Sequence, residues 1–368
     1  MIRLSKSCLD QQEKKAVNRV ISNAYLGMGP EVKNFEKEIK EYLNTKSSII
    51  AVSSGTAALH ISLQACGIGI NDEVLVPSIT YIASFQAISA TGASPIACDI
   101  DLDTGFIDLK DAKKRVSKRT KAIMPVHYAS NSSQMNMVYK FAKDFNLKVI
   151  EDAAHSFGSF REGKKIGVKG DIICFSFDGI KNITCGEGGA IVAKDQKIIS
   201  NLLDIRLLGV AGDSNKRYSK QRSWNFDVYD QGWRYHLSDL MAAIGREQLK
   251  KIEKFHYKRK EIIDIYIKNL KNIREIKILN LDYDNNHQHI FPIRVLNKKR
   301  NKLKEYLENK GIQTGIHYQP NHLLKKYRTR YNLPKSKIFG EEILSLPLHC
   351  DLRKKDVSKI IQDVKSFF

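Results

Sequence analysis

The sequence predicts an α/β protein built around a largely parallel sheet. Short apolar runs of strand length, such as SSIIAVS and EVLVPS, alternate with segments of helical periodicity, such as GTAALHISLQACGI. The same alternation continues through KAIMPVHY, MNMVYKFAKDFN and LKVIEDAA. Because strands that alternate with helices form crossover units, neighbouring strands of the sheet are expected to run parallel.

The alternation ends after Ala193, and this change predicts a second domain. The chain has 368 residues, 42% of them hydrophobic, which is enough for a large domain with a full core and a smaller one. A long polar and aromatic stretch, VAGDSNKRYSKQRSWNFDVYDQGWRY, shows no period, and a helical region follows from about Leu237 to Leu270. We therefore expect a large domain over residues 1–250 and a small α+β domain over residues 251–368.

The N-terminal residues and the cysteines indicate the expected location of the protein. The segment MIRLSKSCLDQQEKKAVNRV lacks the apolar core of a signal peptide, and no later run approaches the ~18 apolar residues of a membrane span. The six cysteines are dispersed, without a C-x-x-C pair or a histidine cluster at metal spacing. These features predict a cytoplasmic, reduced and metal-free protein that does not bind membranes.

A formal net charge of +21 raises the question of an anionic partner. Much of the excess lies in segments such as KKIEKFHYKRKEIIDIYIKNLKN, where acids alternate with bases as on a solvated helix face. The chain has no zinc-finger spacing and no aromatic-rich RNA-binding strand, so a nucleic-acid binder is the weaker alternative. A smaller anion, such as a nucleotide diphosphate, fits the same charge.

Three segments place polar residues directly after predicted strands, where ligands of parallel α/β sheets bind. In SSGTAALH, Gly55 and Thr56 open a helix and offer N–H groups and a hydroxyl to a phosphate, although Ser and Thr also cap ordinary helices. In VIEDAAHS, Asp152 ends an apolar run at the expected carboxyl end of the sheet, although this stretch alone is more typical of a surface turn with a helix cap. His155 alone is more typical of a partly buried, hydrogen-bonded histidine.

The third segment contains a lysine at an unusual place. Lys181 follows the apolar run IICFSF and precedes the turn GEGG, so it is expected near the end of the sheet and not on a solvated helix. A lysine that acts as a nucleophilic amine needs desolvation or cationic neighbours to lower its pKa. A single lysine before a glycine turn is more often structural.

Taken together, the three segments match the requirements of pyridoxal 5'-phosphate (PLP). This cofactor requires a lysine for covalent attachment, a carboxylate for its pyridine nitrogen, a phosphate cradle and a flat residue against its ring. Lys181, Asp152, the Gly55-Thr56 pair and Tyr81 supply these groups. They also follow the chain order expected of the aspartate-aminotransferase class of folds.

Over essentially its whole length, the chain resembles the DegT/StrS family of sugar aminotransferases, which transfer an amino group to nucleotide-linked keto sugars. The blocks that carry the resemblance are GPEVKNFEKEIKEYL, SSGTAALH, PSITYIAS, EDAAHSFGS, FSFDGIKNITCGEGG, LSDLMAAIGREQL, HIFPIRV, TGIHYQPNH and LSLPLHCDL. The resemblance implies the fold of type I PLP-dependent transferases. This fold has a large domain with a mostly parallel seven-stranded sheet between helices, and a smaller C-terminal domain.

The resemblance also implies roles for individual residues around the cofactor. Lys181 is expected to bind PLP covalently and to move the proton in catalysis, and Asp152 to keep the pyridine nitrogen protonated. Tyr81 is expected to stack on the ring, and His155 to lie near the ring hydroxyl. The phosphate is assigned to Gly55, Thr56, the Ala57 backbone and Ser176.

The substrate side is less well specified by the resemblance. His317, Tyr318 and His322, in TGIHYQPNH, are the expected sugar-side residues, although the same segment could be a plain strand and turn of the small domain. In GWRYHLS, Arg234 replaces a family asparagine that reaches the phosphate of the partner subunit's cofactor. A local ion pair with Asp227 or Asp230 is the alternative for that arginine.

The expected function is therefore a PLP-dependent transaminase, active as a homodimer with shared active sites. The amino donor is expected to be glutamate, and the acceptor a nucleotide-diphosphate keto-deoxysugar of a surface polysaccharide such as lipopolysaccharide or O-antigen. The segment NITCGEGG resembles family members that act on 4-keto sugars more than those that act on 3-keto sugars, which implies a 4-keto acceptor. Asp178 stands where a histidine or an aromatic residue is common in the family. A non-catalytic regulator with the same fold is the main alternative.

Overall fold

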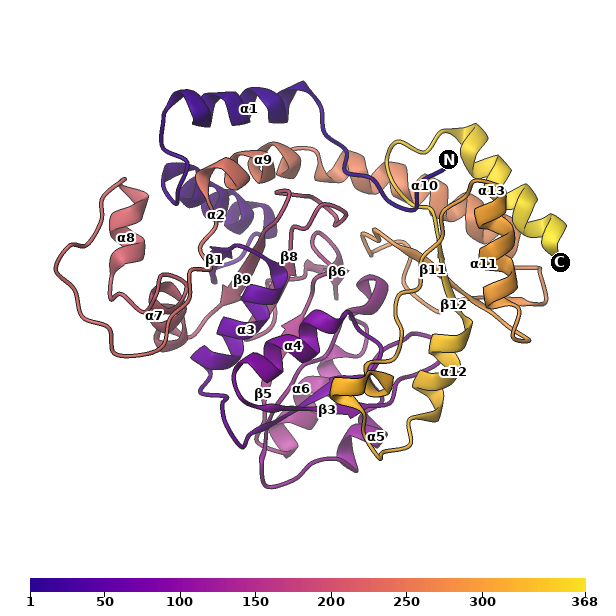
Figure 1. Cartoon of the computed structure of the whole chain (residues 1–368), viewed down its shortest axis with the longest axis horizontal. Helices are drawn as coiled ribbons and strands as arrows, with labels where there is room; N and C mark the ends of the chain where they lie inside the picture. The colour runs from indigo at the N-terminus through magenta and orange to yellow at the C-terminus, as the bar shows by residue number, and fades with distance from the viewer.

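A seven-stranded sheet forms the centre of the computed structural model, which describes residues 1–368 (Figure 1). Its strands lie in the order β1, β9, β8, β5, β4, β2, β3. Only β9 runs against its neighbours, and the other six strands are parallel to one another. The strand bounds are β1 Ser48–Val52, β2 Glu73–Pro77, β3 Ser94–Cys98, β4 Thr120–Ile123, β5 Lys148–Asp152, β8 Ile172–Ser176 and β9 Gly189–Ala193. The predicted, mostly parallel seven-stranded sheet is confirmed.

Helices cover both faces of this sheet because its strands alternate their side chains between two cores. In β1, for example, Ile50 and Val52 enter one buried apolar cluster, whereas Ile49 and Ala51 enter another. Helices α3, α4 and α7 pack on the first face, and α2, α9, α5 and α6 cover the second. The bounds of the helices up to α9 are α1 Gln11–Ser22, α2 Pro30–Leu43, α3 Gly55–Ala65, α4 Ile82–Ala90, α5 Leu109–Lys113, α6 Met135–Asp144, α7 Gln196–Ile205, α8 Asp213–Tyr218 and α9 Asp239–Leu249.

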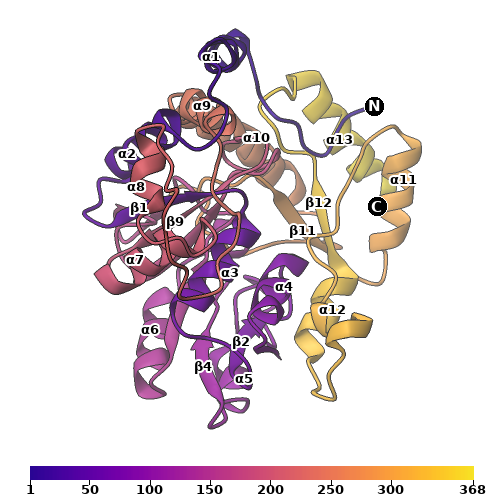
Figure 2. The same cartoon turned by 60° about the vertical axis from the view of Figure 1, so that its left-hand side comes forward.

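The C-terminal part has its own antiparallel sheet, in the order β10, β11, β12, which lies beside the large sheet (Figure 2). Its core is formed by this sheet together with helices α10, α11 and α13. The element bounds here are α10 Ile252–Leu270, β10 Ile276–Ile278, β11 Phe291–Val295, α11 Arg300–Asn309, α12 Pro334–Glu342, β12 Ile343–Leu346 and α13 Lys354–Phe367. The remaining short elements are the hairpin strands β6 Phe160–Arg161 and β7 Lys164–Lys165 and three 3-10 turns at Tyr128–Ser130, Asn321–Leu323 and Lys325–Tyr327.

Helix α10 belongs to both cores. Ile252 and Phe255, in its first turns, pack into the core of the large sheet, whereas Ile262 and Tyr266 pack into the C-terminal core. The chain also begins beside the C-terminal part, where Ile2 forms a β-bridge with Ile312, and both figures show the N-terminus close to α13. The division of the chain at residue 250 stays a prediction. The expected helical region from Leu237 to Leu270 is present as two helices, α9 and α10.

The long aperiodic stretch after Val210 is mostly irregular, apart from the short helix α8. Two of its aromatic residues face solvent: Trp224 is 86% exposed and Tyr229 is 80% exposed. None of the helices combines the length and the apolar character needed to cross a lipid bilayer.

A buried ion pair connects α7 to the helix that covers the other face of the sheet. The Arg206 guanidinium, which is fully buried, donates to Glu36 Oε1 at 2.7 Å and to the Ala51 carbonyl at 2.8 Å. The Tyr218 hydroxyl donates to the second oxygen of Glu36 at 2.5 Å. This network fixes α2, α7 and the start of the exposed aromatic stretch to the edge strand β1.

We predict that Glu36→Ala lowers the free energy of unfolding by about 3–5 kcal/mol, because it leaves the Arg206 charge buried without its partner. Urea titration followed by circular dichroism measures this loss. The control is Lys37→Ala, which removes an exposed i,i+4 pair with Glu41 and should cost less than about 1 kcal/mol. Equal effects of the two substitutions would contradict a structural role for the buried pair.

Candidate active site

A cavity of about 560 Å³ opens at the carboxyl ends of the parallel strands. It is bounded by the segments after β1, β2, β5 and β8 and by a segment of the C-terminal part. The lining residues are Ser54, Gly55, Thr56, Leu59, Thr80, Tyr81, Ala83, Val126, Asp152, Ala154, His155, Ser176, Asp178, Ile180, Lys181, Glu187, Ile316, His317 and Tyr318. The structure therefore brings together most of the residues predicted from the sequence, including Lys181 and Asp152.

Lys181 supplies an amine to this cavity. The side chain is half-buried, and its Nζ has no hydrogen-bond acceptor or ion-pair partner in the chain. Burial lowers the pKa of the Lys181 amine below its usual value, while the charges of Asp152 and Asp178 act in the opposite direction. Desolvation therefore favours the neutral form of the Lys181 amine, which is the form that a nucleophilic lysine needs.

Asp152, the last residue of β5, supplies a buried carboxylate. Its Oδ2 accepts a hydrogen bond from Ser84 at 2.7 Å and its Oδ1 accepts one from the Ala154 N–H at 3.2 Å. Thr80 Oγ1 lies 2.8 Å from Ser84 Oγ, so a hydroxyl relay leads from Thr80 to the carboxylate. Burial raises the pKa of Asp152, and these hydrogen bonds oppose that shift. A cationic N–H donor placed in the cavity would stabilise its charged form.

The N-terminus of α3 and the end of β8 form a cradle for an anion. Gly55 and Thr56 are the first two residues of α3, so their N–H groups have no acceptor inside the helix. A Cβ on Gly55 would lie only 2.8 Å from Cβ of Ser176, which means that only glycine allows this approach of helix to strand. Two amides, the Thr56 hydroxyl and the Ser176 hydroxyl thus face one end of the cavity.

His155, Tyr318 and Tyr81 form an aromatic part of the cavity lining. The Ala129 N–H donates to His155 Nδ1 at 3.3 Å, which assigns the ring proton to Nε2, 2.9 Å from the Tyr318 hydroxyl. Burial lowers the pKa of His155 well below its usual value, so the ring is neutral. Tyr81 is 60% exposed at the cavity mouth, and its ring centroid lies 5.8 Å from that of Tyr318.

Three of the residues predicted for the site do not line this cavity. The Ala57 N–H donates to Ser54 Oγ at 3.0 Å, so the adjacent helix cap already uses it. His322 is buried, and its Nδ1 lies 2.6 Å from Ser78 Oγ. Arg234 is exposed, has no ion pair with Asp227 or Asp230, and forms a β-bridge with Leu207. The proposed ligand contacts of these three residues stay predictions.

The structure also adds residues that the sequence did not single out. Glu187, in the GEGG turn, lines the cavity beside Asp178, and burial together with the charge of Asp178 raises its pKa. Neither carboxylate has a cationic partner within the chain. Ser84 lies inside α4, at the end of the block PSITYIAS, and only the folded structure reveals that its hydroxyl donates to Asp152.

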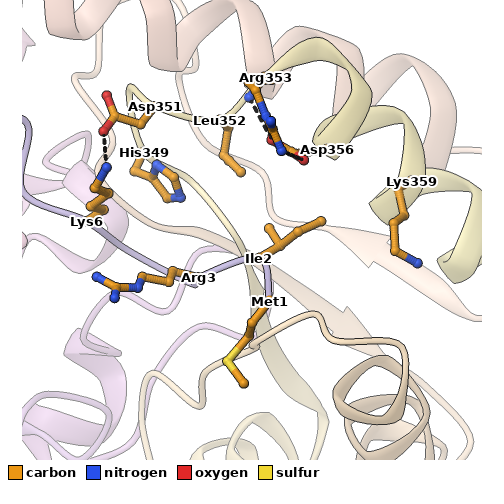
Figure 3. A pocket seen from close by; sticks show the side chains of 10 residues that line it. All are labelled: Met1, Ile2, Arg3, Lys6, His349, Asp351, Leu352, Arg353, Asp356 and Lys359. Atoms are coloured by element: carbon orange, nitrogen blue, oxygen red, sulfur yellow. Dashed lines mark hydrogen bonds and ion pairs between the residues drawn. The ribbon is translucent and has the colours of Figure 1, made fainter.

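Figure 3 shows a second hollow, of about 490 Å³, between the N-terminal segment and the start of α13. Three of its four cations are paired with acids: Lys6 with Asp351 at 2.5 Å, Arg353 with Asp356 at 2.8 Å, and Lys359 with Asp363 at 2.7 Å. The hollow contains no unpaired lysine amine and no buried carboxylate, and no group of three or more metal-binding side chains occurs in the chain. The cavity around Lys181 is therefore the candidate active site.

The residues around Lys181 fit PLP. The unpartnered Lys181 amine matches the cofactor aldehyde, and the buried Asp152 carboxylate, oriented by Ser84 and the Ala154 N–H, matches a protonated pyridine nitrogen. The cradle of Gly55, Thr56 and Ser176, which an added Cβ would close, matches the phosphate.

Comparison with known proteins identifies the family. The sequence profile of the DegT/DnrJ/EryC1/StrS aminotransferase family matches residues 7–365. The chain belongs to this family. It is also 34% identical over 370 residues to MJ1066 of Methanocaldococcus jannaschii, across 98% of this chain and 96% of the relative.

Solved structures of family members agree with this assignment. Helicobacter pylori PseC, an aminotransferase involved in the biosynthesis of pseudoaminic acid, superposes with a TM-score of 0.91 at 29% identity, covering 100% of this chain and 99% of PseC. Spr1654 of Streptococcus pneumoniae in its PLP form superposes with a TM-score of 0.90 at 28% identity, covering 99% of this chain and 98% of Spr1654. The sugar aminotransferase CalS13 of Micromonospora echinospora superposes with a TM-score of 0.90 at 25% identity, covering 100% of both chains. This DegT-family protein is thus a PLP-dependent sugar aminotransferase with the type I fold.

The lowered pKa of Lys181 can be tested on protein without cofactor. In cofactor-free protein, trace acetylation between about pH 7 and pH 11 should reach half-maximal reactivity at lower pH for Lys181 than for the exposed Lys14, because a depressed pKa leaves more free amine. Mass spectrometry of the peptides gives both curves from one experiment. A Lys181 curve that coincides with the Lys14 curve would contradict the desolvated amine.

Proposed function

We propose that this DegT-family enzyme moves an amino group from L-glutamate to the keto carbon of a nucleotide-diphosphate keto-deoxysugar, with a 4-keto sugar as the favoured acceptor. The observation that supports it best is the unpartnered Lys181 amine in one cavity with the buried Asp152 carboxylate and an anion cradle. Bound PLP would accept the amino group from the donor and then release it to the keto sugar, acting as an electron sink in both directions.

Lys181 has two tasks in this proposal. Its amine would hold the cofactor when no substrate is bound, and with substrate bound the same Nζ would accept a proton from the reacting carbon and return it. Both tasks need a neutral amine at physiological pH. Burial favours the neutral form, while Asp152 and Asp178 limit the shift so that the group can still accept a proton.

Asp152 stabilises the positive charge on the pyridine nitrogen in this proposal. The carboxylate is oriented by Ser84 and by the Ala154 N–H, so it needs no reorganisation when charge develops on the ring. Tyr81 would stack on one face of the ring, and His155 would lie near the ring hydroxyl. Gly55, Thr56, Ser176 and, once Ser54 moves away, the Ala57 N–H would hold the phosphate.

Acceptor groups at the cavity mouth support a sugar as the second substrate. Asp178 and Glu187 offer carboxylate oxygens without cationic partners, and such oxygens bind sugar hydroxyls. Because the Tyr318 hydroxyl accepts the His155 Nε2 proton, its own proton is available to a ligand. His317 lines the same wall, with its Nδ1 2.8 Å from Ser345 Oγ, whereas a contact from His322 would require the His322–Ser78 bond to break.

A homodimer with shared sites is the proposed assembly. Arg234 is a permanent cation with no acidic partner in its own chain, and the exposed Trp224 and Tyr229 lie in the stretch that precedes it. In the dimer, Arg234 would reach the cofactor phosphate or the substrate diphosphate of the second copy and bind it through two donors. Burial of Trp224 and Tyr229 between subunits would explain their exposure in the single chain.

We place the reaction in the cytoplasm, in the synthesis of an amino sugar for a surface polysaccharide such as lipopolysaccharide or O-antigen. The involvement of PseC in pseudoaminic acid biosynthesis supports an amino-sugar product. A PLP-binding regulator without turnover is the alternative. It would bind the cofactor yet fail to convert any keto sugar when glutamate is supplied.

The first prediction of this proposal concerns covalent attachment. Purified protein with PLP should be yellow, and borohydride should fix the cofactor on Lys181, as peptide mapping will show. Lys181→Ala should lose transamination by at least about 1,000-fold, because a positioned general base and the covalent link are both removed. Cofactor found on another lysine, or normal turnover of the variant, would refute the assignment.

Mixed dimers test the shared site. Arg234→Ala alone should weaken cofactor or nucleotide-sugar binding by about 1.5–3 kcal/mol, the usual value of a charge-assisted contact. When Arg234→Ala chains pair with Lys181→Ala chains, both lesions fall in one composite site and the other site is intact. About half of the wild-type activity per dimer is therefore expected. Mixed dimers no more active than the Arg234→Ala homodimer would place Arg234 and Lys181 in the site of the same chain.

A further inference from the structure

The segment that carries Lys181 has no regular secondary structure of its own. It runs from the end of β8 at Ser176 to the start of β9 at Gly189. Local turns shape it: the Lys181 N–H donates to the Asp178 carbonyl at 3.2 Å, and the Cys185 N–H donates to the Phe177 carbonyl at 2.9 Å. Within the segment, no N–H donates to the Lys181 carbonyl, so the position of this carbonyl depends on contacts from elsewhere in the chain.

Those contacts come from the C-terminal part of the chain. Arg259, on α10, donates from Nη2 to the Lys181 carbonyl at 3.3 Å and from Nη1 to the Asn182 carbonyl at 3.1 Å. The Asn182 side-chain amide donates in turn to the His287 carbonyl. One guanidinium thus binds two successive carbonyls, and its planar shape sets their relative orientation.

Stability alone does not explain an arginine at this place. Arg259 is only 7% exposed, has no carboxylate within ion-pair distance, and leaves its Nε without an acceptor. Burying a guanidinium without an acid is unfavourable, and an apolar residue at the same place is often more stabilising. On α10 the residue lies in the buried stripe between Phe255 and Ile262, where helical periodicity calls for an apolar side chain.

The backbone at Arg259 is held rigidly because α10 packs on both cores. Phe255 packs into the core of the large sheet and Ile262 into the C-terminal core, so Arg259 extends from the point where α10 passes from one core to the other. A side chain on a packed helix holds its partner more precisely than a side chain on a loop does. Lys181 is therefore tied to the scaffold that joins the two cores.

We propose that Arg259 is a positioning residue for the reaction: it fixes the main chain at Lys181 so that Nζ stays in the cavity. The inference rests on the proposed role of Lys181 in the reaction. Arg259 itself touches neither the cavity nor the reacting atoms, and it acts through the two carbonyls.

The test uses two variants and a matched control. Arg259→Met removes both donors but keeps an unbranched side chain, and Arg259→Lys keeps the charge but has a single donor centre. The control is Arg300→Met, because Arg300 is also a buried arginine without an acidic partner that donates to a main-chain carbonyl, that of Ile343 at 2.9 Å. On α11 its side chain bonds only to Asn301 and Ile343 and not to the segment that carries Lys181.

Two readouts on cofactor-free protein report the position of Lys181 directly. In Arg259→Met, the acetylation midpoint of Lys181 should move up towards that of Lys14, because a loosened segment exposes the amine to water. Hydrogen exchange of the amides from Lys181 to Cys185 should become about tenfold faster or more. Arg259→Lys should lie between wild type and Arg259→Met, and Arg300→Met should leave both readouts unchanged.

With PLP bound, Arg259→Met should lower kcat about tenfold or more and change KM for the amino donor much less, because a misplaced Nζ affects proton transfer more than binding.

If Arg259→Met loses stability like Arg300→Met but leaves the titration and exchange at Lys181 unchanged, the arginine is structural and the inference is wrong. Should Arg259→Met fail to fold, an unshifted Arg259→Lys would overturn it equally. If the labelling responds as expected but no keto sugar is converted, the positioning role stands and the proposed function fails.

Discussion

The parallel alignment of β1, β2, β5 and β8 is the constraint on which the rest of the site depends. Since these strands run in the same direction, the segments that follow them meet at one edge of the sheet, however far apart they lie in the sequence. The anion cradle follows β1, the aromatic wall follows β2, the carboxylate ends β5 and the lysine follows β8. No single segment is distinctive, and their function comes from being brought together.

Burial gives these groups their chemistry. The same desolvation lowers the pKa of the Lys181 amine and raises that of the Asp152 carboxylate, so both groups shift towards their neutral forms. Their mutual attraction and the hydrogen bonds to Asp152 limit these shifts. A ligand that brings a cationic N–H to Asp152 and an aldehyde to Lys181 satisfies both groups, which is why the cavity fits PLP.

The C-terminal part of the chain completes the site and does not merely cover it. Tyr318 and His317 form one wall, and Arg259 holds the main chain of Lys181 from behind. Helix α10 carries this connection because its buried stripe passes from the core of the large sheet to the C-terminal core. The geometry at Lys181 is therefore sensitive to how the two cores pack on each other.

The sequence by itself determined the fold class, the family and the cofactor, because these depend on local patterns. The periodicity of the strands and helices predicted the parallel sheet, and the ordered blocks around Gly55, Asp152 and Lys181 predicted a PLP enzyme, as the comparisons confirm. Only the tertiary structure decided which side chains touch. It turned the Ala57 N–H to a helix cap, kept His322 out of the cavity and placed Ser84, Glu187 and Arg259 around the site. Such contacts join residues far apart in the chain, and they depend on how helices pack on strands, which no local pattern of residues specifies.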